Sequence, residues 1–199
     1  MDTDNKILMI IDPQVDFISG SLAVEGAAET MNTLAGYIRM YGHRYKHIIV
    51  TADRHPIDHC SFERNGGQWP VHCVADSIGA AIWQPIMDAL IERGEGVSVL
   101  HKGEDPDHEE YSIFKSVDAR HRITDIICSL IDTTTDDGEV FQLDICGIAG
   151  DYCVADTIRD GIEIYGSDVF RVLTSYVSSI DNGETLSDLI DKFKLSCDR

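Results

Sequence analysis

Residues 141–165 read FQLDICGIAGDYCVADTIRDGIEIY, and the pattern of apolar residues changes in the middle of this stretch. The first eight residues have the length and apolar density of a buried strand. From Cys153 onward, apolar side chains recur at intervals of four residues, which is typical of one face of a helix. Between the two patterns, Gly147 and Gly150 allow a tight turn. The stretch therefore predicts a buried strand that passes through a sharp turn into an amphipathic helix.

The same alternation of patterns continues along the rest of the chain. Strand patterns occur near 6–12, 47–52, 97–101, 141–148 and 168–173, and helical patterns near 27–42, 78–93, 118–131, 153–165 and 183–194. This order favours right-handed βαβ units, and therefore an α/β fold with a mainly parallel sheet of five or six strands and helices on both faces. A sixth strand at the edge has no clear position in the sequence. Because the chain contains no repeat, low-complexity tract or linker, we expect one domain over residues 1–199.

Cys153 lies at the start of the predicted helix 153–165, directly after the sharp turn, and this makes it a candidate nucleophile. A thiol in the first turn of a helix is close to the positive end of the helix dipole, which favours the thiolate. The turn before it would present backbone N–H groups that could bind a developing oxyanion. The alternative is a buried core cysteine. We expect the other cysteines to be buried in this way or merely exposed: Cys60, Cys73, Cys128, Cys146 and Cys197.

Two further candidates for chemistry follow other predicted strands. The apolar run 7–11 ends in Asp12, and the strand pattern 97–101 ends in Lys102. Functional groups gather at the carboxyl ends of the strands in an open parallel sheet, so Asp12, Lys102 and Cys153 are expected to face one crevice. A carboxylate can take the thiol proton, and an ammonium favours the charged forms of both neighbours. The alternative is an aspartate cap, a solvated lysine and a packed cysteine with no relation to one another.

A third group of polar residues follows the predicted strand 47–52. Asp53 and His55 are two positions apart in an extended stretch, so they can share one metal ion, and His72 could be a third ligand from a returning loop. Two imidazoles and one carboxylate with open positions suit a catalytic divalent metal, with zinc first and iron or manganese as alternatives. His59 could support these ligands or join them. The alternative is a histidine-rich loop that only binds water.

Composition narrows the classes of partner. A formal net charge of −19 argues against a nucleic-acid surface and an anionic membrane surface, because both require local positive charge. The start of the chain lacks the pattern of a signal peptide, and the six cysteines lack paired spacing. We therefore expect a cytoplasmic protein with a small-molecule substrate, and a homo-oligomer is left open. The acid-rich segments 104–110 and 132–139 are predicted to be solvated loops.

Six stretches together carry a resemblance to a known family. They are IIDPQVDFISGSLAVEGA (10–27), TADRHPIDHCSF (51–62), WPVHCV (69–74), HKG (101–103), EEYSIF (109–114) and GIAGDYCV (147–154). With these motifs the chain resembles the nicotinamidase/pyrazinamidase family of the isochorismatase-like cysteine hydrolases, over nearly its whole length. The resemblance implies an isochorismatase-like three-layer sandwich. It also implies a metal-dependent amidohydrolase that converts nicotinamide to nicotinate and ammonia through a thioester, in NAD salvage.

The resemblance also implies roles for individual residues. The catalytic triad would be Asp12, Lys102 and Cys153, and the metal ligands would be Asp53, His55 and His72. The oxyanion hole would be formed by the backbone N–H groups of Ala149 and Cys153, with a cis peptide bond between Ile148 and Ala149. Phe17, Trp69 and Tyr111 are our candidates for the walls around the substrate.

Two alternatives to this function stay open at the level of sequence. The first is a cysteine hydrolase of the same fold that acts on a linear carbamoyl or ureido amide, for which Asp53, His55 and His72 would not be needed. The second is a non-catalytic binding module. Isochorismatases proper cleave a vinyl ether and lack the nucleophilic cysteine, so Cys153 disfavours them.

Overall fold

The computed structural model describes residues 5–131 and 141–198, and its centre is a six-stranded sheet in the order β3-β2-β1-β4-β5-β6. Every pair of neighbouring strands is parallel. The strands are β1 (Lys6–Ile11), β2 (His47–Asp53), β3 (Val97–Lys102), β4 (Gln142–Ile148), β5 (Phe170–Ser178) and β6 (Ser196–Cys197). The helices are α1 (Val15–Ile18), α2 (Ala27–Tyr41), α3 (Gln84–Arg93), α4 (Val117–Leu130), α5 (Ala155–Tyr165) and α6 (Glu184–Phe193).

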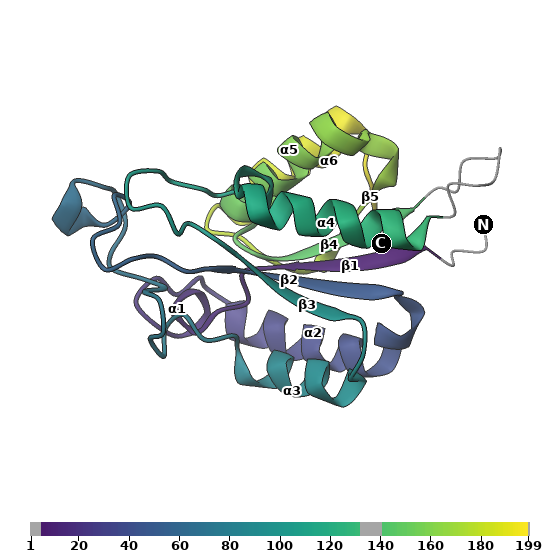
Figure 1. The fold of residues 1–199 in the computed structure, drawn as a ribbon, viewed down its shortest axis with the longest axis horizontal. Helices are drawn as coiled ribbons and strands as arrows, with labels where there is room; N and C mark the ends of the chain where they lie inside the picture. Colours follow the sequence, from purple (N-terminus) through teal and green to yellow (C-terminus); the bar gives the residue numbers. More distant parts are fainter. Residues whose placement is uncertain (1–4, 132–140, 199) are drawn as a thin grey trace.

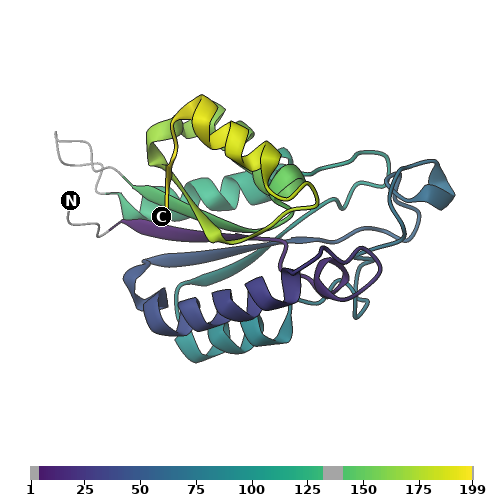
Figure 2. The same ribbon diagram turned by 180° about the vertical axis from the view of Figure 1, so that it is seen from behind.

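Helices cover both faces of the sheet, because successive residues of the central strands point to opposite sides. In β1, Ile7, Met9 and Ile11 pack in one core with α4, α5 and α6, whereas Leu8 and Ile10 pack in the other with α1, α2 and α3. Figures 1 and 2 show these two layers of helices, one on each side of the strands. The expected α/β fold, with a parallel sheet between two helical layers, is confirmed.

Two expectations about individual elements needed the structure. The sixth strand is β6, a two-residue strand that pairs with β5 at the edge of the sheet. The helix expected over 78–93 begins only at Gln84, so that prediction is wrong for its first six residues. Those residues pair instead with the segment after β1, since Val15 N donates to Ala81 O and Asp16 N donates to Gly79 O. Pro85 then opens the helix in its first turn, where a missing N–H is tolerated.

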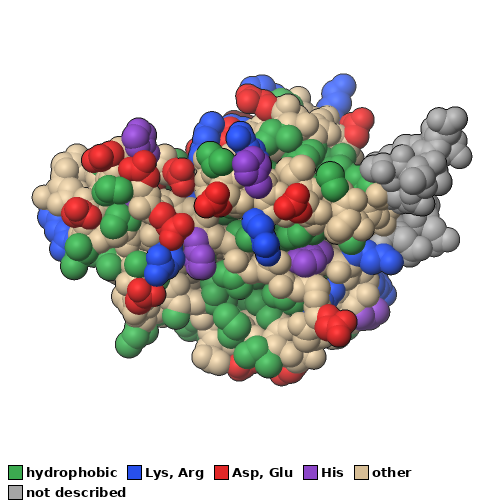
Figure 3. All heavy atoms as spheres, viewed as in Figure 1, with side chains coloured by type: hydrophobic (Ala, Val, Ile, Leu, Met, Phe, Trp, Pro, Cys, Tyr) green, Lys and Arg blue, Asp and Glu red, His purple; other side chains and the backbone are tan. Residues whose placement is uncertain are grey.

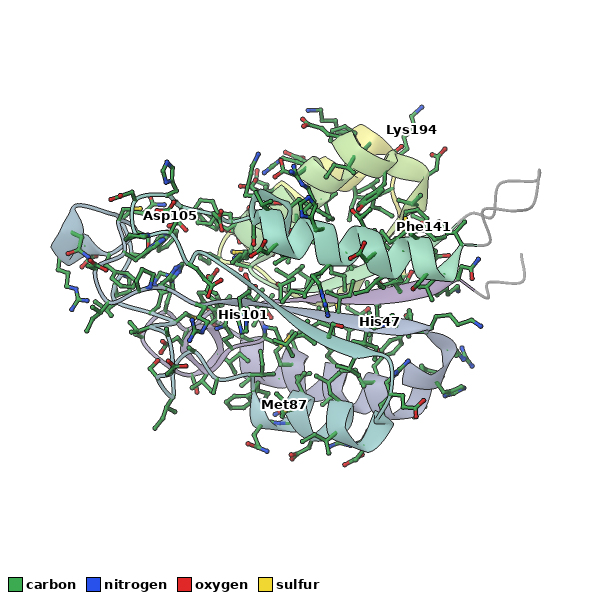
Figure 4. All side chains as sticks on the ribbon, in the orientation of Figure 1. His47, Met87, His101, Asp105, Phe141 and Lys194 are labelled. Atoms are coloured by element: carbon green, nitrogen blue, oxygen red, sulfur yellow. The ribbon has the colours of Figure 1, made fainter. Side chains whose placement is uncertain are left out.

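The carboxyl ends of the strands meet at one end of the molecule. Figure 4 marks this end with His101, in β3, and Asp105, in the loop that follows, while His47 and Phe141 lie toward the other end. Residues 104–110 are a largely exposed loop, as expected, and 132–139 lie outside the described residues. Acidic side chains are spread over the face seen in Figure 3. No helix among the described residues is long and apolar enough to cross a membrane.

Candidate active site

Asp12, Lys102 and Cys153 meet at the carboxyl end of the sheet. Asp12 directly follows β1, Lys102 ends β3, and Cys153 belongs to a π-helical turn, Gly150–Val154, between β4 and α5. Lys102 Nζ lies 2.9 Å from Asp12 Oδ2 and 3.6 Å from Cys153 Sγ. All three side chains are buried. The structure therefore brings together the three residues that the sequence placed at separate strand ends.

The turn that carries Cys153 depends on a close approach between β4 and β1. Gly147 has a φ of +121°, and a Cβ at this position would lie 2.1 Å from the carbonyl oxygen of Ile11. Only glycine allows this contact. The peptide bond between Ile148 and Ala149 is cis, as the resemblance implied. Ala149 and Cys153 both line the adjoining cavity, and their role in binding an oxyanion stays a prediction.

Burial decides the resting protonation of the thiol. It raises the pKa of Cys153 well above the usual value, and the ammonium of Lys102 lowers it only in part. The helix proper starts at Ala155, after the π-helical turn, so Cys153 does not occupy its first turn. The expectation that the helix dipole favours the thiolate is therefore not supported: burial favours the protonated thiol, and attack by the sulfur then requires a base.

Asp12 is suited to be this base. Burial raises the pKa of Asp12, and Lys102 opposes this shift without cancelling it. Burial lowers the pKa of Lys102, but the ion pairs with Asp12 and Asp53 raise it by more than burial lowers it. The pKa of Lys102 is therefore well above its usual value. Lys102 is thus an ammonium that links the two carboxylates. A raised pKa makes a carboxylate a stronger proton acceptor, which is what removal of a thiol proton needs.

Asp53, His55 and His72 form a second cluster next to the first. Their potential ligand atoms all lie within 4.8 Å of one another. Asp53 ends β2 in register with Lys102, and its Oδ1 accepts from Lys102 Nζ at 2.5 Å while Oδ2 lies 3.6 Å from His55 Nε2. Burial raises the pKa of Asp53, but Lys102 and His55 lower it to below its usual value. The cluster therefore contains a carboxylate at neutral pH.

The two imidazoles of this cluster are oriented by backbone carbonyls. His55 Nδ1 lies 2.8 Å from Gly103 O, and His72 Nδ1 lies 2.8 Å from Pro70 O, so each ring has Nε2 left as a ligand atom. A Cβ at Gly103 would lie 2.5 Å from His55 Cε1, so this glycine makes room for the ring.

One of these nitrogens is left without a partner. His55 Nε2 is buried and has no hydrogen-bond partner within the described part of the chain. A buried polar atom without a partner is costly, and a bound cation would satisfy it. Two imidazole nitrogens and a carboxylate oxygen are also the donors that a divalent transition metal prefers. The residues present therefore fit a metal such as zinc.

His59 supports this cluster from behind. Its ring stacks on that of His55 with 4.0 Å between centroids. His59 Nδ1 lies 2.7 Å from Ser61 Oγ and Nε2 lies 3.1 Å from the carbonyl oxygen of His108, so both ring nitrogens have partners. Of the two roles left open by the sequence, support for the ligands is the one that these contacts favour. The carboxylate of Glu109, which the sequence did not single out, lies within 4.8 Å of potential ligand atoms of His55 and His59.

A cavity of about 30 Å³ connects the two clusters. It is lined by Phe17, Leu22, Val24, Asp53, Trp69, His72, Glu109, Tyr111, Ala149, Tyr152, Cys153 and Ile180. The three expected wall residues all lie on it. Trp69 Nε1 donates to Tyr111 Oη at 3.0 Å, and the ring of Phe17 lies 5.5 Å from that of His72. Contact of these rings with a substrate stays a prediction.

Several lining residues escaped the sequence analysis. Tyr152 packs on Trp69 and Tyr111, with centroids 5.1 and 5.5 Å apart, and completes the aromatic wall. Leu22, Val24 and Ile180 lie where the small cavity meets an outer one of about 590 Å³, so they form its mouth. Tyr152 adjoins Cys153 in the motif and could have been suspected. Ile180 belongs to the loop after β5, which carries no motif.

Comparisons with known proteins agree with this fold. The chain is 30% identical to the nicotinamidase of Saccharomyces cerevisiae over 95% of both chains. It superposes on the pyrazinamidase of Pyrococcus horikoshii in complex with zinc with a TM-score of 0.80, at 26% identity over 98% of this chain and 99% of that one. For yeast nicotinamidase bound to the inhibitor nicotinaldehyde, the TM-score is 0.78 at 25% identity, over 96% and 98%. No protein-family model matches the chain.

The structural matches define the class as an α/β protein with the isochorismatase-like fold. Within this class, the identity to the yeast enzyme over almost all of both chains is decisive. The chain belongs to the nicotinamidase/pyrazinamidase family of amidohydrolases. The N-carbamoylsarcosine amidase of Thermoplasma acidophilum shares the fold, with a TM-score of 0.69 at 20% identity over 98% of this chain and 96% of that one.

Proposed function

We propose that the protein hydrolyses nicotinamide to nicotinate and ammonia through a thioester on Cys153, as a cytoplasmic step of NAD salvage. The observation that carries this proposal is one aromatic-walled cavity lined both by the Cys153 thiol, with Lys102 Nζ 3.6 Å from its sulfur, and by Asp53 and His72 of the second cluster. Two groups of different chemistry on one such cavity suit a substrate with two different polar ends. Nicotinamide has a carboxamide and a ring nitrogen.

The first half of the proposed reaction uses the triad. Asp12 takes the proton of Cys153 while Lys102 stabilises the charges that form. The thiolate attacks the carboxamide carbon, and the N–H groups of Ala149 and Cys153 bind the oxyanion. Asp12 then returns the proton to the leaving nitrogen, the carbon–nitrogen bond breaks and ammonia departs.

The second half releases the acid. Water attacks the thioester carbonyl, the carbon–sulfur bond breaks, and nicotinate leaves with the thiol restored. Asp12 is placed to take a proton from this water, because its carboxylate lies close to the sulfur on which the acyl group is held. Phe17, Trp69 and Tyr111 would hold the ring and limit the water that enters the cavity.

Asp53, His55 and His72 would hold one divalent metal ion, with zinc as the first candidate and iron or manganese as the alternatives. When bound, such an ion supplies a borderline Lewis acid that suits a neutral pyridine nitrogen. The protein's own contribution is to orient both imidazoles through Gly103 O and Pro70 O and to keep Asp53 ionised through Lys102.

The alternative substrate is a linear carbamoyl or ureido amide. The fold is shared with an N-carbamoylsarcosine amidase, but likeness of fold does not specify a substrate. Against this alternative, a linear amide gives no reason for the buried, unpartnered His55 Nε2. A third reading, a binding module without activity, conflicts with the three triad side chains assembled around Lys102 Nζ.

An ammonia-release assay tests the proposal directly. The purified protein is offered nicotinamide, pyrazinamide, benzamide and N-carbamoylsarcosine, and the metal content of the same sample is measured. We expect the highest kcat/KM for a pyridine or pyrazine carboxamide, with about one metal ion per chain. Hydrolysis of N-carbamoylsarcosine in preference to nicotinamide would move the function to the linear-amide alternative.

A further inference from the structure

Thr51 touches the proposed base at three points. This residue lies in β2 two positions before its end, and its side chain is fully buried. Thr51 Oγ1 donates to Asp12 Oδ1 at 2.6 Å and also accepts from Asp12 N at 3.2 Å. Asp12 N lies at the same distance, 3.2 Å, from the carbonyl oxygen of Thr51. The hydroxyl therefore holds both the backbone and the carboxylate of Asp12.

The backbone of Asp12 explains why such a hold is needed. Its φ is +46°, in the left-handed region that residues other than glycine rarely adopt. Strain of this kind persists only where surrounding contacts impose it, and it gathers at functional sites. Here the left-handed residue turns the chain out of β1, and the contacts with Thr51 set the direction of its side chain.

The two carboxylate oxygens of Asp12 are therefore in different situations. Oδ1 accepts the short bond from Thr51. Oδ2 lies 2.9 Å from Lys102 Nζ and, within the described residues, accepts no hydrogen bond of ordinary geometry. A carboxylate oxygen of Asp12 also lies within 4.8 Å of Cys153 Sγ. One oxygen thus serves as an anchor, and the other keeps a lone pair available on the side of the ammonium.

We propose that Thr51 is a positioning residue: its hydroxyl anchors Asp12 through Oδ1 and so directs Oδ2 to receive the proton of Cys153. The inference rests on the proposed function in one respect, that Asp12 is the base. Thr51 is not among the residues that line the cavity, and the hydrogen bonds of its hydroxyl group described above are to Asp12. Its contribution is orientation, for which a misplacement of ~1 Å can lower a rate by ~10²-fold.

The sequence offers a matched set of variants. Thr51→Val keeps the shape of the side chain and removes the hydroxyl, whereas Thr51→Ser keeps the hydroxyl and removes only a methyl group. We expect Thr51→Val to lower kcat for ammonia release by ~10–100-fold, with KM changed by less than ~3-fold. Thr51→Ser is expected to stay within ~3-fold of the wild type in both constants.

A second readout needs no amide substrate. Methyl methanethiosulfonate is small and neutral, and it reacts with thiolates. A bond forms between Cys153 Sγ and the methylthio sulfur, the bond from that sulfur to the sulfonyl sulfur breaks, and methanesulfinate leaves while Asp12 takes the thiol proton. The rate is followed by mass spectrometry of the peptide that contains Cys153. Cys128, exposed on α4, provides the internal reference, and its rate should be the same in every variant.

The decisive measurement is a double-mutant cycle on this rate. We expect Thr51→Val to slow modification of Cys153 by ~10-fold or more in the wild-type background. In the Asp12→Asn background, the same substitution should change the rate by less than ~2-fold, because its effect passes through Asp12. If the slowing persists in full without the carboxylate, or if Thr51→Ser is as slow as Thr51→Val, the proposal is overturned.

Folding is checked by circular dichroism, and Thr51→Ala replaces Thr51→Val in the same cycle if the valine variant does not fold. The two proposals fail separately. If the wild-type protein releases no ammonia from nicotinamide, the proposed function is wrong, while the thiosulfonate cycle still decides the role of Thr51. If ammonia is released and the cycle shows no coupling between Thr51 and Asp12, only the positioning proposal is lost.

Discussion

Asp144 and Asp12 are both buried carboxylates, but they differ in the use of their oxygens. Asp144 lies within β4, opposite Leu8 of β1, and is 1% exposed, whereas Asp12 directly follows β1 and is 0% exposed. Asp144 Oδ2 accepts from Tyr45 Oη at 2.7 Å and lies 3.5 Å from Arg171 Nη1, and Oδ1 accepts from Gln142 Nε2. Asp12 has a hydrogen bond to Oδ1 from Thr51, and its Oδ2 has only the ion pair with Lys102.

The difference shows that the position of a buried carboxylate along a strand decides whether it stabilises the fold or takes part in the reaction. Inside the sheet, a carboxylate is tolerated when each oxygen has a donor, and Tyr37 extends the network through a 2.6 Å contact between its hydroxyl and that of Tyr45. At the carboxyl end, a carboxylate with a free lone pair lies beside a thiol and an ammonium. Burial and charge partners of that kind mark functional groups. We therefore expect Asp144 to serve stability and Asp12 to serve turnover.

The largest effect is expected at the nucleophile. Cys153→Ala should abolish ammonia release, because Cys153 is the cysteine that lines the cavity. Cys146→Ala is the matched control, since Cys146 is equally buried in β4 and faces the core instead of the cavity. It should keep its turnover. Activity near the wild-type level in Cys153→Ala, with metal content and circular dichroism unchanged, would end the covalent mechanism.

The next effect separates the two aspartates directly. Asp12→Asn should lower kcat/KM for nicotinamide by ~10²–10⁴-fold, the range for the loss of a positioned acid–base group. Asp144→Asn should change kcat/KM by less than ~3-fold, because the partners of its carboxylate are Tyr45, Gln142 and Arg171, which belong neither to the triad nor to the metal cluster. Both constants come from the same ammonia-release assay. Equal losses in the two variants would contradict the assignment of different roles.

A third test concerns the proposed metal site of Asp53, His55 and His72 at the carboxyl end of the sheet. We expect kcat/KM for nicotinamide to exceed that for benzamide by ~10²-fold or more, since a ring nitrogen that is anchored fixes the carboxamide over Cys153. Chelation, or His55→Ala, should remove most of this preference together with the bound metal. His101→Ala, at an exposed position of β3, serves as the control and should retain both. Equal rates for the two amides in metal-loaded protein would rule out the ring anchor.

Smaller effects are expected on the free energy of unfolding, and here the substitution of Asp144 should have the larger effect. Asp144→Asn should lower the free energy of unfolding by about 1–3 kcal/mol, because an amide leaves buried donors of the network unsatisfied. Asp12→Asn should cost less, because burial already disfavours the charge of Asp12, as its raised pKa indicates. Urea denaturation of both variants measures this difference. A larger loss for Asp12→Asn would show that Asp12 also holds the fold together.

The smallest effect is expected at the edge of the Asp144 network. Tyr45→Phe removes one buried hydrogen bond to the carboxylate and should lower the free energy of unfolding by about 0.5–1.5 kcal/mol, with unchanged kcat/KM. Tyr37→Phe, one bond further from Asp144, should cost no more than this. A greater cost for Tyr37→Phe would indicate that the ring contacts of Tyr37 with Tyr41 and Tyr176, and not the hydroxyl chain, stabilise this region.

Much of the fold could be predicted because local patterns and packing agree. The runs that became β1, β2 and β4 are largely apolar, as is typical of buried parallel strands, and their alternation with amphipathic helices leaves few arrangements. Where local and long-range contacts compete, the prediction failed. Residues 78–83 have a helical pattern, but the backbone of Gly79 and Ala81 pairs with the segment after β1, and the helix starts later.

Local patterns were enough to predict the order of strands and helices, the family motifs and the candidates Asp12, Lys102, Cys153, Asp53, His55 and His72, because strand ends and motif spacings are local properties of the chain. Three-dimensional packing was needed to show that burial raises the pKa of Cys153, that Thr51 holds Asp12, and that Tyr152 and Ile180 line the cavity. Protonation depends on the solvent that burial removes, and these contacts join segments tens of residues apart. Neither the protonation of the thiol nor these contacts can be predicted from a local pattern, since both depend on loops from distant parts of the sequence that pack together at the ends of the strands.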